Sequence, residues 1–470
     1  MMSKISGAFS QIFRVDPQER IKLLMLTITY FLVIASYTIV QAMKDAIFLH
    51  VVGEDWLGWV SIASIFVLIP AILFYSYMVD RIRSYQLLYV YSLFYGIVGL
   101  IFAYYIGDPQ IGIANTTCSS IRVFGWLFYF FVQGYSPFVI SLFWSFANSI
   151  TDPKQAKDTY GLMVSGSKLG GAISALIAWY LFSSIAPNCN GVFQYQVLML
   201  MSFGCLCLVP ISIFVLTKVV PAKNMHGYEA VYRAQKQQEK SHKKEGLCSG
   251  LKIMLKQPYV LGIFSIIFFY EIIHQVVNYQ RLIFANQEAS HIASLSSKLF
   301  YQWFWIHLIG FAISLLGTNL LLRKLGERRC LLMIPIITGG LVLLYTLNNT
   351  FNLFNSVTFV SWVFISLKSL NYAISYPIRE SLYIPTVKDI KFKSKSWIDS
   401  FGSRFSKAFG GSFNIFSKSL HSSYGMGAFL FSQYVFFSIV VFLWVVAAYL
   451  LGKKYQKTID NNEVIGLPEA

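Results

Sequence analysis

Charged residues are scarce in this sequence. Asp, Glu, Lys and Arg make up 13% of its 470 residues, whereas a typical soluble domain has about 25%. Acidic residues are rarer than basic ones, with 21 Asp and Glu against 38 Lys and Arg. In addition, 56% of the chain is hydrophobic. This low content of charged residues and high content of hydrophobic ones exclude an ordinary soluble domain. We therefore expect a protein that lies in lipid.

Sequence motifs for catalysis are also missing. The H-E-x-x-H pattern of metal-dependent proteases, the G-x-S-x-G pattern of serine hydrolases and the G-x-x-x-x-G-K-[ST] phosphate loop are all absent. Without a nucleophile paired with a base, we expect no enzyme. Nothing in the sequence calls for a metal or another cofactor. The net charge of +17 is divided among short connections, so we expect no nucleic-acid partner and no obligate protein partner.

Cysteine is rare, and the six present do not form a disulfide framework. Cys118 and Cys189 both fall in connections that we expect to face outward. Sequence alone does not fix the separation of their Cα atoms. A disulfide between them therefore stays an open question.

Long apolar runs, in contrast, recur along the whole chain. Runs such as 23–42 and 426–450 are long enough to cross a hydrocarbon core of ~30 Å. Lipid offers no hydrogen-bond partners, so these runs must be helices. We predict an all-α polytopic membrane protein with about twelve transmembrane helices. The predicted spans are 22–48, 57–79, 87–106, 122–149, 160–185, 195–217, 259–286, 298–322, 330–348, 355–383, 397–420 and 426–451.

Basic residues alternate between the connections of these helices. The connection after every second helix carries Lys and Arg, as at Arg81 and Arg83, and the others are nearly free of them. The positive-inside rule then places both termini in the cytoplasm, and we expect a bacterial inner membrane protein. The predicted divisions are a cytoplasmic segment 1–21, a six-helix bundle 22–217, a basic cytoplasmic linker 218–257, a second six-helix bundle 258–451 and a cytoplasmic tail 452–470.

Ionisable residues inside the predicted spans mark candidate sites, because such residues usually line a polar cavity or pair with another charge. Cations outnumber carboxylates in this set, which favours a cavity that binds a phosphate-bearing anion. Lys44 and Asp45 are adjacent, so we expect their side chains to point to different helix faces. The set comprises Lys44, Asp45, Lys168, Glu271, His274, Arg281, His307, Lys368, Arg379, Glu380, Arg404 and Lys407.

Two local patterns refine this set. Glu271 and His274 are three residues apart and share a helix face. They are candidates for proton coupling together with Asp45, while an interhelical hydrogen bond is the alternative role for His274. Glycine-rich stretches at 166–171 and 407–411 occupy the fifth and eleventh predicted helices. We attribute their glycines to close helix packing, and the lysine in each stretch remains a candidate site.

Several segments together resemble the bacterial and plastid ATP/ADP translocase family. The segment Y-P-I-R-E-S-L-Y-I-P at 376–385, followed by K-S-K-S-W-I-D at 393–399, is similar to the family's proline, basic residue, glutamate and Tyr-Ile-Pro run. The segment F-W-S-F-A-N at 143–148 resembles the equivalent stretch of the first half. M-K-D at 43–45 and K-A-F-G-G at 407–411, preceded by Arg404, resemble the family's first and eleventh spans.

The resemblance implies an ATP/ADP-type nucleotide antiporter with two major-facilitator-like halves that provide alternating access. It implies phosphate binding by Lys44 and Lys407. The complete candidate substrate-binding set is Lys44, Lys407, Arg404, Lys168, Asn148, Arg379, Glu380 and Gln275.

The sequence departs from the family at three positions. Gln133 and Gln275 stand where family glutamates are expected, with Glu271 one turn from the second, and Tyr376 stands where aspartate is frequent. A second hypothesis therefore stays open. It is a proton-coupled permease of the major-facilitator type for another nucleotide, a nucleotide cofactor or a non-nucleotide solute.

Overall fold

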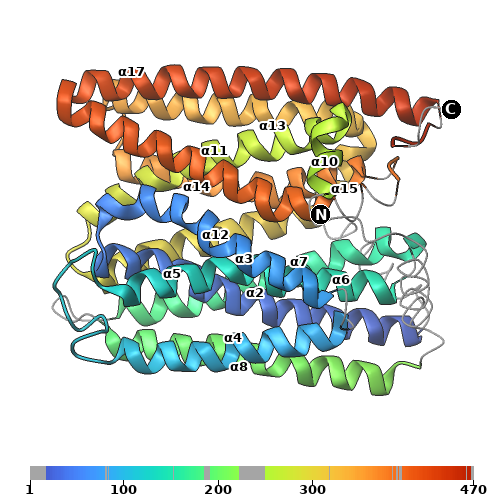
Figure 1. Cartoon of the computed structure of the whole chain (residues 1–470), viewed down its shortest axis with the longest axis horizontal. Helices are drawn as coiled ribbons and strands as arrows, with labels where there is room; N and C mark the ends of the chain where they lie inside the picture. The colour runs from blue at the N-terminus through green and yellow to red at the C-terminus, as the bar shows by residue number, and fades with distance from the viewer. Residues whose placement is uncertain are drawn as a thin grey trace.

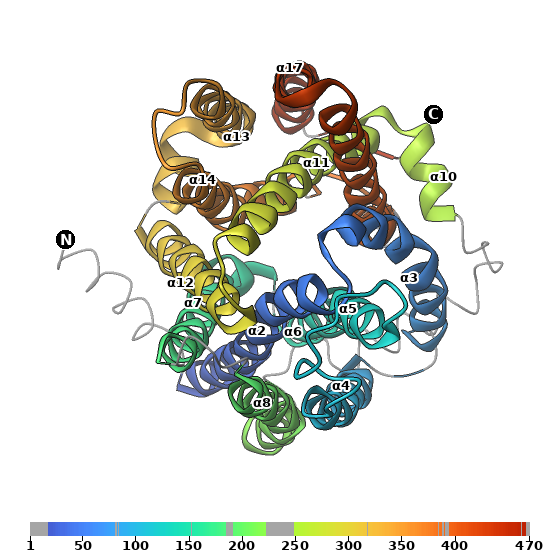
Figure 2. The same cartoon turned by 90° about the vertical axis from the view of Figure 1, so that its left-hand side faces the viewer.

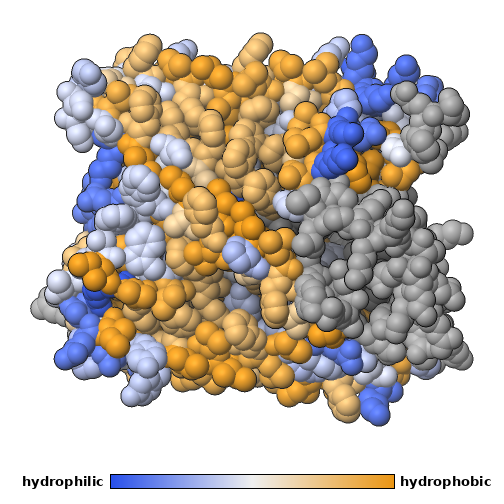
Figure 3. Space-filling view, viewed as in Figure 1, coloured by the Kyte–Doolittle hydropathy of each residue, from blue (hydrophilic) through white to orange (hydrophobic). Residues whose placement is uncertain are grey.

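The computed structural model describes residues 17–79, 82, 84–151, 153–184, 191–221, 249–316, 318–383, 385–387, 390, 394–461 and 463–466. Nearly all of these residues are helical, and the described ranges contain no β-strand. On the face seen in Figure 3, apolar side chains cover the middle, and hydrophilic ones gather toward the two ends. Nine described helical segments are long and apolar enough to cross a membrane. The chain is therefore an all-α integral membrane protein, as predicted.

The N-terminal half is a bundle of long helices, in which the fourth predicted span is made of three consecutive segments. Its elements are α2 (Pro17–Val51), η1 (Glu54–Trp56), α3 (Leu57–Val79), α4 (Ser84–Ile106), α5 (Val123–Tyr135), η2 (Ser136–Ile140), α6 (Ser141–Ile150), α7 (Pro153–Ser183) and α8 (Val192–Val219).

The C-terminal half repeats this arrangement. Its elements are α10 (Ser249–Lys256), α11 (Pro258–Gln287), α12 (Ile292–Leu316), α13 (Thr318–Phe351), α14 (Ser356–Leu370), η4 (Asn371–Ser375), α15 (Tyr376–Leu382), α16 (Lys395–Trp397), η6 (Ile398–Gly402) and α17 (Ser403–Asp460). The backbone of Gly425 has a φ of 80°, a conformation that glycine adopts without strain. The chain reverses there, so α17 consists of two long arms (Figure 1).

The two halves lie side by side with their helices running in the same general direction. The N-terminal half, blue to green, forms the lower part of Figure 1, and the C-terminal half, yellow to red, forms the upper part. A view along the helices shows the same division (Figure 2). The beginning of α2 and the end of α17 lie at one end of the molecule. We call the opposite end, with residues 52–56, 107–122, 288–291 and 352–355, the distal end.

The predicted spans agree with the observed helices within six residues, with three larger differences. α13 begins at Thr318 rather than at 330 and bends at Gly326. α7 begins at Pro153 rather than at 160, which suits a proline because the first turn of a helix needs no N–H donor there. α17 continues to Asp460, so the predicted tail boundary at 452 falls inside a helix that carries exposed lysines beyond its apolar part. The linker residues 249–256 form α10, and 222–248 lie outside the described residues. The number of twelve spans stays a prediction.

Glycines permit close contacts between the halves. α7 packs against α2 and also against α12 of the other half, and α17 packs against α11 and also against α3. A Cβ atom on Gly171 would lie 2.6 Å from the His307 ring, and one on Gly411 would lie 2.9 Å from the Gly58 carbonyl oxygen. Larger residues would force the helices apart. The packing role predicted for the two glycine-rich stretches is confirmed.

The fourth and tenth spans each contain a π-helical segment, which the sequence reasoning missed. η2 contains Pro137, and η4 ends two residues before Pro377. Proline lacks the N–H that the regular helix ladder needs, and single π-helical turns inside α-helices are frequent at functional sites. The two segments thus occupy corresponding places in the two halves and both face the interior through buried residues.

Candidate functional site

Charged side chains gather where the two halves meet. The described part of this region holds six cations and two carboxylates, so positive charge is in excess there. The cations are Lys44, Lys168, Arg281, Lys368, Arg404 and Lys407, and the carboxylates are Asp45 and Glu271. The predicted electropositive character of the centre is therefore present in the structure.

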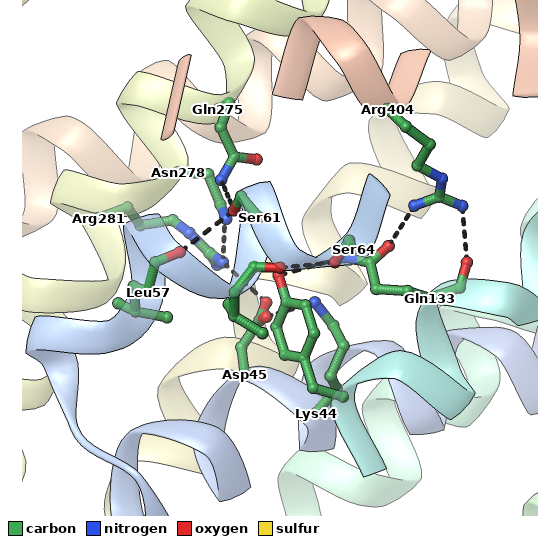
Figure 4. Close-up of polar contacts among 12 residues, drawn as sticks. Lys44, Asp45, Leu57, Ser61, Ser64, Gln133, Gln275, Asn278, Arg281 and Arg404 are labelled. Carbon is green, nitrogen blue, oxygen red and sulfur yellow. Dashed lines mark hydrogen bonds and ion pairs between the residues drawn. The ribbon is translucent and has the colours of Figure 1, made fainter. Parts of the chain in front are cut away.

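Asp45 is bound by two of these cations. Lys44 Nζ lies 2.6 Å from Asp45 Oδ1, and Arg281 Nη2 lies 3.8 Å from Asp45 Oδ2 (Figure 4). The expectation that Lys44 and Asp45 point to different faces is wrong. The long lysine side chain folds back beside its neighbour, over the ring of Tyr129 at 4.1 Å, because a buried ammonium needs an anion. Lys44 is therefore locally neutralised in this conformation.

Arg281 is held from several sides. Its guanidinium donates to Asn278 Oδ1 at 2.8 Å and to Gln302 Oε1, and it lies 4.0 Å from the centre of the Phe364 ring. Only 1% of its surface is exposed. Because α11 carries Arg281 and α2 carries Asp45, their ion pair joins the two halves, and this extensive support identifies Arg281 as a structural anchor.

Two glutamines connect the halves as well. Arg404 of α17 donates to the side-chain and backbone oxygens of Gln133, both at 2.7 Å. Gln275 of α11 donates to the Ser61 hydroxyl of α3 at 2.9 Å (Figure 4). Amides are neutral, so Gln133 satisfies the Arg404 donors without cancelling the guanidinium charge. A carboxylate at 133 would remove that charge from the interface.

Lys407, Glu271 and His274 form a loose group. Glu271 Oε2 lies 3.8 Å from Lys407 Nζ and 3.9 Å from His274 Nδ1, distances too long for hydrogen bonds. Neither His274 nitrogen has a hydrogen-bond partner among the described residues. The Lys407 side chain remains 25% exposed, although it lies one turn from Arg404 on the helix face that meets the other half. Both the lysine and the carboxylate can therefore change partners.

Lys168 also reaches across the boundary between the halves. Its Nζ lies 3.7 Å from the centre of the Tyr372 ring in η4, and Lys368 Nζ lies 5.5 Å from the same centre. His307 stacks against Tyr372 with ring centres 6.4 Å apart, and its Nε2 bonds to Thr38 at 2.9 Å. Lys168 thus belongs to the central region as predicted, but next to an aromatic ring rather than a carboxylate.

Other predicted residues lie apart from this centre. Glu380 accepts from Lys395 at 2.5 and 2.8 Å, and Arg379 lies 5.3 Å from the Tyr376 ring centre. The Asn148 side chain lies outside the described residues. Cys118 is exposed and free, and Cys189 lies outside the described residues.

Tyr372 was missed by sequence reasoning. Aromatic residues make up 17% of the chain, so a single tyrosine carries no signal of its own. Lys368 lies four residues before Tyr372, a spacing that puts a cation and a ring on one helix face. The position of Tyr372 four residues after an intramembrane lysine was the sequence signal that could have identified it as a site residue.

Comparison with known proteins identifies the family. A sequence profile of the TLC ATP/ADP transporter family matches residues 114–455. ADP,ATP carrier protein 1 of Rickettsia prowazekii (strain Madrid E) is 22% identical over 502 aligned positions that cover 96% of this chain and 97% of that protein. ADP,ATP carrier protein 3 of Rickettsia typhi (strain ATCC VR-144 / Wilmington) is 23% identical, with 90% and 92% covered.

A solved structure shows the same fold. The major facilitator superfamily proton:xylose symporter bound to 6-bromo-6-deoxy-D-glucose superposes with a TM-score of 0.62 at 12% identity, covering 93% of this chain and 95% of that one. At this identity the likeness concerns the arrangement of helices alone. The profile match extends over most of the chain, and this protein belongs to the TLC ATP/ADP transporter family.

Proposed function

We propose that this protein is a nucleotide antiporter that exchanges ATP and ADP across a membrane by alternating access. Two six-helix halves, separated by the linker 218–257, rock around the site between them. The observation that carries the proposal is the excess of cations over carboxylates at this boundary. The family match and the ADP,ATP carriers among its relatives support the choice of substrate.

Lys407 and Arg404 have the clearest roles in this proposal. Both lie on one turn of α17, where Arg404 contacts Gln133 of the N-terminal half and Lys407 lies 3.8 Å from Glu271 of α11. An ammonium group supplies a compact charge for one phosphate, and a guanidinium supplies a planar set of donors for another. Lys44 also binds phosphate once the Asp45 carboxylate turns from Lys44 to Arg281, whose Nη2 lies 3.8 Å from Asp45 Oδ2.

Contacts at the distal end support the mechanism of alternating access. Lys418 of α17 forms an ion pair with Asp55 of the N-terminal half, and Tyr195 of α8 bonds to Ser296 of α12. These contacts hold the halves together beyond the site. A carrier that opens alternately to the two sides must break them once in each cycle.

We also propose that the protein lies in a bacterial inner membrane with both termini in the cytoplasm. The beginning of α2 and the end of α17 share one end of the molecule. That end carries the exposed Lys453, Lys454 and Lys457, as the positive-inside rule expects of a cytoplasmic face. A fluorescent protein fused to the C-terminus should fold and fluoresce, whereas a fused alkaline phosphatase should stay inactive; the reverse pattern would contradict this orientation.

Uptake into proteoliposomes tests the transport activity. Vesicles loaded with ATP should take up labelled ADP in a saturable manner, and empty vesicles should not. Lys407→Gln should lower uptake about tenfold or more, since a lost charge-assisted contact costs roughly 1.5–3 kcal/mol. Lys454→Gln, an exposed tail substitution, is the matched control and should transport normally. Folded, reconstituted protein that takes up neither ADP nor ATP under any loading would refute the proposal.

Proton-coupled uptake is the second candidate function, favoured by the separation of 3.9 Å between Glu271 and His274. A carboxylate and an imidazole this close can pass a proton through one water molecule. Uptake into empty vesicles driven by an imposed pH gradient, and its loss in His274→Gln, would establish this function. Exchange that is independent of the pH gradient and unchanged in His274→Gln would exclude proton-coupled uptake.

A further inference from the structure

Tyr372 lies beside two ammonium groups that approach from different helices. Lys168 Nζ of α7 lies 3.7 Å from the ring centre, and Lys368 Nζ of α14 lies 5.5 Å from it. Both distances are within the ~6 Å over which a ring attracts a cation. Lys168 comes from the N-terminal half and Tyr372 from the C-terminal half, so this cluster spans the boundary around which the halves move.

No carboxylate lies within ion-pair distance of either lysine in the part of the chain that the structure describes, although Glu271 acts on Lys368 from farther away. Neither forms an ion pair or a hydrogen bond with a described residue, although Lys168 is only 7% exposed. In contrast, Lys44 is paired with Asp45 and Lys407 lies near Glu271. A ring compensates a buried ammonium only by about 0.5–2 kcal/mol, which is less than the cost of leaving such a charge without an anion.

Glu271 interacts electrostatically with Tyr372, and a neutral aromatic group lies against the ring. His307 stacks on Tyr372, and its Nδ1 has no hydrogen-bond partner among the described residues. Tyr372 lies in η4, where the π-helical turn follows Lys368 by three residues. The cluster is also continuous with the central site, because the charges of Lys368 and Glu271 interact, as do those of Lys368 and Lys407.

We propose that Lys168 and Lys368, held beside Tyr372, form a second phosphate subsite. This subsite binds one phosphate group while Lys407 and Arg404 bind another, so that the carrier selects nucleotides with two or more phosphates over monophosphates. The inference rests on the proposed nucleotide transport. The inference adds the Tyr372 cluster to the substrate site. The cluster then distinguishes nucleotides by their number of phosphate groups. The phosphate group belongs either to the same nucleotide or to free inorganic phosphate.

Calorimetric titration of the purified full-length protein with ADP, AMP and inorganic phosphate tests this assignment. Wild type should bind ADP at least tenfold more tightly than AMP. In Lys168→Gln and Lys368→Gln the ADP affinity should fall about tenfold and the AMP affinity should stay within twofold. Lys298→Gln is the control, because Lys298 is paired with Glu288 at the distal end and should leave all affinities unchanged.

The three ligands separate the two sources of phosphate. A selective loss of ADP affinity assigns the subsite to the nucleotide's own phosphate, and loss of inorganic phosphate binding with ADP and AMP affinities unchanged assigns it to the free ion. ADP, AMP and phosphate affinities that all stay at the wild-type level, or that all fall together, would overturn the subsite. Wild-type protein that binds no nucleotide while Lys168→Gln still weakens phosphate binding would reject the nucleotide transport but keep the subsite.

Thermal unfolding without ligand provides a second readout that does not depend on the substrate. If Lys168 is an uncompensated buried cation, Lys168→Met should raise the apparent melting temperature, since it removes a charge and keeps most of the side-chain volume. A lower melting temperature would show that Lys168 is satisfied within the protein, which contradicts its role as an anion-binding group.

Discussion

Asp45 of α2 and Arg281 of α11 face each other across the boundary between the halves, with 3.8 Å between Oδ2 and Nη2. The same carboxylate accepts a hydrogen bond from Lys44 at 2.6 Å. One anion thus serves two cations, one from each half. Its position makes Asp45 the residue on which both the stability of the contact and the charge of the site depend.

Removal of the Asp45 carboxylate should destabilise the protein strongly. Asp45→Asn leaves Lys44 and Arg281 without an anion in a buried place, a change that typically costs about 3–5 kcal/mol. Arg281→Gln should cost less, because Lys44 still neutralises Asp45. The double variant should lose less stability than the sum of the two single losses, with a coupling free energy of roughly 0.5–3 kcal/mol. Thermal unfolding in detergent measures this, and strictly additive losses would contradict the pairing.

The Lys44 and Asp45 pair shows where sequence reasoning reached its limit. Helical periodicity places adjacent side chains about 100° apart, which led us to assign them to different faces. A lysine has four rotatable bonds, and in a low-dielectric interior its ammonium moves to the nearest carboxylate. Periodicity predicts where a Cβ atom points but not where a long flexible side chain ends.

Neutralising Glu271 should tighten nucleotide binding. Its carboxylate lies 3.8 Å from Lys407 Nζ and competes with phosphate for that cation, so Glu271→Gln should raise the affinity for ADP several-fold. Glu288→Gln, which breaks a pair at the distal end, is the control and should leave the affinity unchanged. Calorimetric titration with ADP gives both values. Weaker binding in Glu271→Gln would mean that the carboxylate itself contacts the substrate or orients Lys407.

A single methyl group at Gly411 should impair transport. The added Cβ would lie 2.9 Å from the Gly58 carbonyl oxygen and 3.1 Å from Ser61 Cβ, and a backbone oxygen cannot rotate away. Overpacking of this kind costs about 1–3 kcal/mol, so Gly411→Ala should lower both the melting temperature and the exchange rate.

Gly340→Ala is the matched control for Gly411→Ala. No atom lies within 4 Å of a Cβ built on this helical glycine, and alanine should stabilise the helix by roughly 0.5–1 kcal/mol. Equal behaviour of the two variants would show that α3 and α17 cross more loosely than the structure indicates.

The helices and the glycine-rich crossings were predictable because each depends on local sequence. Apolar runs of about 20 residues have no alternative to the helix in lipid, and two adjacent glycines on a helix permit close approach. The partners across the boundary were not predictable. Arg404 with Gln133 and Lys168 with Tyr372 join residues more than 200 positions apart, and their pairing depends on how the halves dock.

Cross-linking at the distal end should stop transport, because the halves must separate there for the site to open to that side. Asp55 and Lys418 form an ion pair between the halves, and their side chains are 74% and 42% exposed, so thiol reagents can reach cysteines at both positions. In a Cys118→Ser background, which removes the one exposed thiol among the described cysteines, Asp55→Cys/Lys418→Cys should lose exchange after treatment with a short bifunctional thiol reagent and regain it after reduction. Each single cysteine variant should keep its activity under the same treatment. Full exchange by completely cross-linked protein would mean that these helices stay together throughout the cycle, and the opening would then have to occur elsewhere between the halves.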